Sequence, residues 1–96
     1  MKINLQSLHF KASAQLKDFV DEKVGKLAHI SDEILSAEVV LTANDIKITN
    51  NKVCEIRLIV PGNDDFVKKE AASFEEAILD AVEVLQKILK QKKIKH

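Results

Sequence analysis

Apolar and polar residues alternate along four short stretches of the chain, which is the period expected of strands with one buried face. The connection between the second and third stretches is polar and ends in Asn50 and Asn51, which tolerate left-handed backbone geometry and favour an antiparallel hairpin. Ile46 and Ile48 are candidates for extending the second strand into this connection. The expected strands span residues 2–8, 36–44, 52–60 and 65–71.

Two longer stretches have the 3.6-residue period of amphipathic helices. The first is expected over residues 14–29, with Ser13 as its N-cap. Glycine inside a helix costs up to about 1 kcal/mol relative to alanine, so Gly25 predicts a close packing contact at that position. The apolar stripe of this helix comprises Leu16, Phe19, Val20, Val24 and Leu27.

The second helix has the strongest periodicity in the chain. Ser73 is followed three residues later by Glu76, which is the signature of a capping box at a helix start. The helix is expected to run to about residue 92, although its apolar stripe stops at Leu89. The stripe comprises Phe74, Ala77, Ile78, Ala81, Val82, Leu85, Ile88 and Leu89.

The predicted elements follow the order β-α-β-β-β-α. The first helix is long enough to form a right-handed crossover between the first two strands. Because each helix has one apolar face and the strands alternate, we expect an α+β two-layer sandwich. In it, both helices cover one face of a four-stranded sheet and the other face is open. Residues 1–96 are expected to form a single domain.

Composition restricts the protein's class. Apolar residues make up 46% and charged residues 31%, as in globular proteins. Cys54 is the only cysteine, which excludes an internal disulfide and suits a reducing compartment. The first ten residues lack the continuous apolar segment of a signal peptide, and no stretch approaches the roughly 20 apolar residues of a membrane span. We therefore expect a cytoplasmic protein without a membrane partner.

Charge is sorted along the second helix, although the chain has 15 basic and 15 acidic residues. The charged residues from Ser73 to Glu83 are all acidic, and those beyond Val84 are all lysines. One interpretation is matching of the helix dipole, which stabilises by about 0.3–1 kcal/mol per charge. The other is an anion-binding site, because five lysines after Val84 exceed what one helix end needs. The sequence leaves both open.

Lysines of the first helix favour the second interpretation. They lie beside its apolar stripe, so two helices packed side by side could merge their lysines into one basic surface. Lysine is a point charge, so such a surface would bind the phosphates of RNA or DNA by shape and charge. Arg57 and Lys68 are expected on the open sheet face, as solvated side chains or as a second RNA-facing site. Phe66 is the aromatic residue to examine there for base stacking.

The sequence contains no catalytic or cofactor-binding signature. His9, His29 and His96 are not at the spacing of metal ligands. Two glycines in total cannot build a phosphate-cradling loop. Cys54 lies in an alternating strand and is expected to be a small buried residue. We therefore expect a non-enzymatic protein with no metal, no cofactor and no small-molecule substrate.

Three segments together resemble the ribosome hibernation-promoting factor family. They are LKDFVDEKVGKL at 16–27, EIRLIVPG at 55–62 and EAASFEEAILDAVEVLQKILKQKK at 70–93. Where the family commonly has Ala-Ile-Asp early in the second helix, this chain has Ala77-Ile78-Leu79. The resemblance covers nearly the whole chain.

The resemblance implies a fold related to double-stranded RNA-binding domains. It also implies binding to the small ribosomal subunit and its rRNA under stress or in stationary phase, where the protein would occlude the mRNA and tRNA channel. Because the chain ends at His96, without the extra C-terminal domain of long family members, ribosome dimerisation is expected to need a second factor. The implied RNA-binding residues are Lys17, Lys23, Lys26, Lys87, Lys90, Lys92 and Lys93.

Two other functions remain open at the level of the sequence. The chain could be a general structured-RNA-binding domain that shares the fold. It could also be a protein-interaction or oligomerisation module that uses its open sheet face or a sheet edge.

Overall fold

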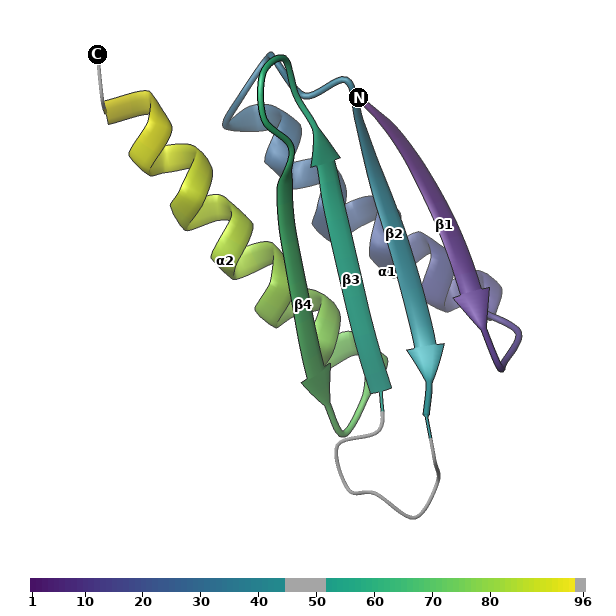
Figure 1. Cartoon of the computed structure of the whole chain (residues 1–96). Helices are drawn as coiled ribbons and strands as arrows, with labels where there is room; N and C mark the ends of the chain where they lie inside the picture. Colours follow the sequence, from purple (N-terminus) through teal and green to yellow (C-terminus); the bar gives the residue numbers. More distant parts are fainter. Residues whose placement is uncertain (45–51, 95–96) are drawn as a thin grey trace.

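Two helices cover one face of a four-stranded sheet, and no helix of the described residues lies on the opposite face (Figure 1). The computed structural model describes residues 1–44 and 52–94, the last two through their helical backbone alone. The expected β-α-β-β-β-α order and two-layer α+β architecture are confirmed. The predicted turn at Asn50 and Asn51 and the extension through Ile46 and Ile48 lie outside the described residues.

The sheet has the strand order β1-β2-β3-β4. β1 pairs with β2 in parallel, as the crossover through the first helix requires, and the other two pairings are antiparallel. Three strands therefore run in one direction and β3 runs in the other. The strand bounds are β1 Lys2–Leu8, β2 Ser36–Ala43, β3 Lys52–Ile59 and β4 Asp65–Ala71.

The first helix begins where the sequence predicted and changes geometry before its predicted end. The Ser13 hydroxyl accepts a hydrogen bond from the Leu16 amide at 3.1 Å, so Ser13 is the N-cap of α1, Ala14–Gly25. The 3₁₀ helix η1, Lys26–His29, continues it directly. The prediction of a close packing contact at Gly25 is wrong, because a Cβ built there would meet no atom within 4 Å.

The second helix, α2, spans Phe74–Ile94 and so runs about half a turn beyond the predicted end. Its N-cap is confirmed, since the Ser73 hydroxyl accepts a hydrogen bond from the Glu76 amide at 3.2 Å. The strands before α1 and α2 run in the same direction, so both helices start at the same end of the sheet. They return toward the other end, where both terminate (Figure 1).

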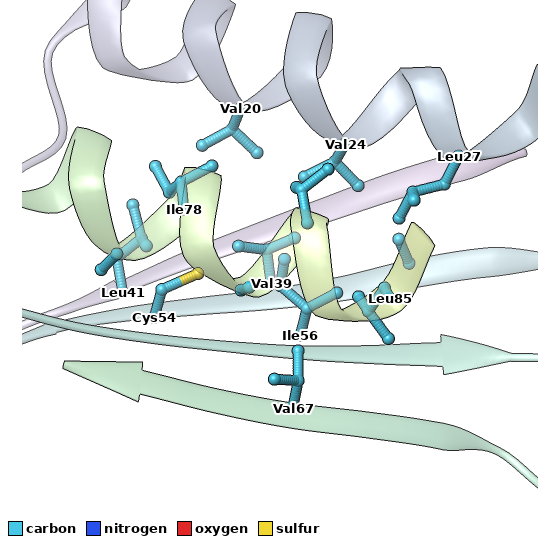
Figure 2. Packing of buried hydrophobic residues seen from close by; sticks show 14 of the residues in the cluster. Val20, Val24, Leu27, Val39, Leu41, Cys54, Ile56, Val67, Ile78 and Leu85 are labelled. Carbon is cyan, nitrogen blue, oxygen red and sulfur yellow. The ribbon is translucent and has the colours of Figure 1, made fainter. Parts of the chain in front are cut away.

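The core lies between the helices and the covered face of the sheet. Figure 2 shows Val20, Val24 and Leu27 of α1 and η1 directed toward Ile78 and Leu85 of α2 and toward the sheet. All five of these side chains are fully buried. The two helical stripes predicted from periodicity therefore supply one side of the core. The alternating strand residues that supply the other side are Ala37, Val39, Leu41, Cys54, Ile56, Leu58 and Val67.

None of the helices among the described residues combines the length and the apolar character that crossing a membrane would demand.

Candidate nucleic-acid interface

The lysines of the first helical segment point in two directions. Lys17 and Lys26 are nine residues apart, or about two and a half turns, so they lie on opposite sides of the helix. Lys23 and Lys26 lie on the side that faces α2, where both line a groove between the helices. The structure therefore brings two of these three candidate residues to the helix–helix boundary, while Lys17 is exposed elsewhere.

The lysines of α2 are also distributed around their helix. Lys87 is exposed on the outer side and pairs with Glu83 at 3.3 Å, one turn earlier. Lys92 lies about 200° around the helix from Lys90, and its Nζ donates to Oδ2 of Asp65 at 2.7 Å, at the start of β4. The side chain of Lys93 lies outside the described part of the structure.

A groove between α1 and α2 places two lysines of the first helical segment against one face of the second helix. Leu79, Glu83 and Gln86 have the i, i+4, i+7 spacing that places them on one face of α2, and Lys90 is the next position on that face. The wall formed by α1 thus carries ammonium groups, and the wall formed by α2 carries apolar, carboxylate and amide groups. The groove has a volume of about 390 Å³ and is lined by Lys23, Lys26, Leu79, Val82, Glu83 and Gln86.

Carboxylates interrupt the basic surface around this groove. Glu22 lies 3.5 Å from Lys23, and Glu83 lies 3.3 Å from Lys87. Exposed pairs of this kind contribute about 0–1 kcal/mol, so a lysine can exchange its carboxylate for a phosphate at little cost. Among the residues that the structure describes, Lys26 and Lys90 have no ion-pair partner. These two ammonium groups are available to a ligand without any rearrangement.

A larger hollow, of about 740 Å³, lies beyond the C-terminal ends of the helices. It is bounded by the loop after η1, the turn between β3 and β4, and the end of α2. Its walls include the carboxylates of Asp32, Glu33 and Asp65, and the lysine that lines it, Lys92, is already bound to Asp65. This excess of negative charge disfavours a phosphate there.

The open sheet face carries an arginine stacked on an exposed phenylalanine. Arg57 on β3 and Phe66 on the edge strand β4 are register partners, and the guanidinium lies 4.9 Å from the ring centroid. Phe66 is 48% exposed, and Arg57 is also 4.0 Å from Asp64. Sequence reasoning singled out both residues but missed their contact, because it depends on the register of β3 and β4. Acidic neighbours such as Glu38 and Glu55 make this face less favourable for RNA than the helix groove.

Cys54 is buried in the core, as predicted. Desolvation, and to a smaller extent the charge of Glu55, raise the pKa of its thiol to about 12. The thiol therefore stays protonated and unreactive at neutral pH, because the thiolate is the nucleophile. Across residues 1–44 and 52–92, no group of three His, Cys, Asp or Glu side chains is placed to hold a metal ion.

Comparison with known proteins agrees with the family predicted from the sequence. The family model described as sigma 54 modulation protein / S30EA ribosomal protein matches residues 3–96. A ribosome hibernation promotion factor of Deinococcus radiodurans is 29% identical over 94 residues, which cover 96% of this chain. The chain spans about half the length of that relative, 49%.

Two solved structures share the fold. The N-terminal domain of protein Y from Thermus thermophilus is 27% identical with a TM-score of 0.80, and the match covers 96% of this chain and 99% of that domain. A ribosomal subunit interface protein from Coxiella burnetii has a TM-score of 0.83 at 19% identity, covering 99% and 100% of the two chains. Because the family model covers almost every residue, this chain belongs to the sigma 54 modulation protein / S30EA ribosomal protein family.

Proposed function

We propose that this protein is a ribosome hibernation factor that binds the small ribosomal subunit and its rRNA. The observation that carries the proposal is the family match over residues 3–96, joined to a relative named as a hibernation promotion factor. The groove between α1 and α2 supports it, because Lys23 and Lys26 line one wall and Lys90 is the next position on the α2 face that forms the other wall. The protein acts in the cytoplasm and inhibits translation during stress without catalysing a reaction.

The mechanism is occlusion. The molecule is elongated, with principal extents of 47 × 23 × 19 Å, and the tight packing of α1, α2 and the sheet makes it a rigid wedge. Lodged in the mRNA and tRNA channel, such a wedge would exclude the translation substrates sterically. Lysine–phosphate contacts would hold it in place by charge rather than by reading sequence.

Within this proposal, the seven candidate lysines divide by geometry. Lys23 and Lys26 line the groove and Lys90 follows Gln86 on the α2 face that borders it, so these three would form the centre of the RNA-binding surface. Lys87 lies farther around α2 and would meet a phosphate at the margin of this surface. Lys17 lies on the opposite side of its helix from Lys26 and stays a predicted contact. Lys92 reaches RNA only by releasing Asp65. Lys93 remains a predicted contact.

A pelleting assay with small ribosomal subunits at low salt tests the proposal. Charge reversal of Lys23, Lys26 and Lys90 to glutamate should abolish co-sedimentation, because three attractive contacts become repulsive. The matched control reverses Lys2, Lys11 and Lys68, which are exposed and lie away from the groove. Both variants have the same net charge, so a difference between them depends on position alone. The control should sediment like the parent.

Three results would contradict the proposal. The parent protein could fail to sediment with subunits, the groove variant could sediment like the parent, or both variants could lose binding equally. A competition between ribosomal subunits and free duplex RNA separates a hibernation factor from a general structured-RNA binder. A hibernation factor prefers the subunit, whereas equal competition would indicate the general binder.

A further inference from the structure

Glu83 is unexpected in a groove that binds phosphates. Its carboxylate lines the groove opposite Lys23 and Lys26, and its side chain is 65% exposed. If the groove only collected phosphates, a negative charge on its wall would weaken binding. The chemistry of the α2 wall therefore calls for a partner that offers hydrogen-bond donors as well as a phosphate.

We propose that the groove between α1 and α2 holds one unpaired guanine nucleotide of the bound RNA, an inference that rests on the proposed function. The Glu83 carboxylate accepts hydrogen bonds from N1–H and the N2 amino group of the base. The Gln86 amide donates to O6, and the phosphate lies against Lys23 and Lys26. The volume of about 390 Å³ suits one nucleotide.

The apolar side of the groove supports the same occupant. Leu79 is 45% exposed although it lies on the helix face that adjoins α1. Beside it, Val82 forms a buried apolar surface. A nucleobase presents a flat face that can cover Leu79 and an edge that can reach Glu83, so one ligand removes apolar surface from water and satisfies the polar groups. A bare phosphate would leave Leu79 exposed.

Guanine fits better than the other bases because it presents two adjacent donors on its Watson–Crick edge. A carboxylate has two oxygens that can accept both at once, and it keeps enough lone pairs to retain Lys87. Uracil presents one donor on that edge, and adenine and cytosine each present one amino group beside an acceptor that would face the carboxylate. The groove therefore favours an unpaired guanine over the other three unpaired bases.

The test measures affinity for purified small ribosomal subunits with Glu83→Gln. The base-reading groove predicts affinity about tenfold weaker than that of the parent, since a good bidentate contact discriminates by roughly this factor. A groove that only collects phosphates predicts the opposite sign, because a repulsive charge is removed. Asp80→Asn is the matched control. It removes an exposed carboxylate from the same helix outside the groove, and it should bind as tightly as the parent or slightly more tightly.

A second measurement identifies the base. Kethoxal modifies N1 and N2 of unpaired guanines, so the parent should protect at least one rRNA guanine that Glu83→Gln leaves reactive. Leu79→Ala should also weaken binding several-fold. Leu35→Ala, at another exposed leucine far from the groove, should bind like the parent. Thermal unfolding of each variant checks that the fold is intact.

The outcomes separate this inference from the proposed function. If the parent does not bind subunits, the proposed function fails and the guanine site fails with it. If the parent binds and Glu83→Gln binds as tightly or more tightly, only the guanine site is overturned. Loss of binding together with loss of a protected guanine supports both.

Discussion

Gly25 occupies a position that does not require glycine. Its backbone is right-handed helical, with φ −58° and ψ −26°, and space for a Cβ is open. Gly62 differs, because its φ of +96° lies in the left-handed region that side chains disfavour. Glycine leaves the unfolded chain more freedom than alanine does. Glycine therefore makes the protein less stable than alanine would at position 25. At position 62 glycine is the residue that fits the backbone without strain.

Gly25→Ala should raise the free energy of unfolding by about 0.5–1 kcal/mol. In a domain of this size, Tm rises by roughly 4–8 °C for each kcal/mol of added stability. Gly62→Ala is the control and should be destabilising, because alanine is strained at positive φ. Calorimetry or chemical denaturation measures both changes. Destabilisation by Gly25→Ala would mean that the junction of α1 with η1 needs glycine after all.

At the scale of elements, an ion pair joins the C-terminal part of α2 to the sheet. Lys92 and Asp65 approach to 2.7 Å, and the Asp65 side chain is only 12% exposed. Among the side chains that the structure describes, Leu89 is the last residue of α2 in the buried core. The Lys92–Asp65 pair ties the last turns of α2 to the start of β4.

Lys92→Gln should lower stability by about 1 kcal/mol, because it leaves the carboxylate of Asp65 without its cation in a half-closed hollow. Hydrogen exchange of the last turns of α2 should accelerate. Lys87→Gln removes a pair in which both side chains are about two-thirds exposed, so stability should stay within a few tenths of a kcal/mol. A double-mutant cycle with Asp65→Asn measures the coupling. A coupling energy near zero would show that the pair does not hold the helix.

At the scale of the molecule, zero net charge coexists with a local cationic groove. The acids of α2 precede its lysines, and both helices end at the same end of the sheet. In the proposed function, long-range attraction to RNA would therefore be weak, and binding would depend on contacts made at short range. Such a protein should bind a shaped RNA site and not coat nucleic acid in general.

The salt dependence of ribosome binding should reveal which face meets RNA. Lys26→Gln should reduce the slope of log affinity against log salt by about one, because one phosphate contact is lost. Lys68→Gln removes the same charge from the open sheet face and should leave the slope unchanged. The reverse result would place the RNA on the sheet face, next to Arg57 and Phe66.

The local signals in the sequence were sufficient for most of the fold. The bounds of β1 and β4, the caps at Ser13 and Ser73, and the two helical stripes depend on neighbouring residues, and all are confirmed. The tightening of the first helix into η1 was missed, because a 3₁₀ turn and an α-turn share nearly the same apolar spacing.

The candidate site was predicted less completely. The sequence identified lysines on two helices, but which of them lie beside the other helix depends on how the two helices pack. Lys17 and Lys26 lie on the same helical segment, yet only Lys26 meets α2. The groove, the contact of Lys92 with Asp65 and the stacking of Arg57 on Phe66 all join residues far apart in the chain.

By itself, the sequence determined the order of the elements, the buried face of each, and the sorting of charge along α2. These properties follow from the two-residue period of strands, the 3.6-residue period of helices and the capping residues. All three signals depend on residues that are close together in the chain. Only the tertiary structure decided that Lys23 and Lys26 face Glu83 and Leu79 across one groove. The physical reason is that this arrangement depends on how two apolar stripes pack against each other and against the same sheet.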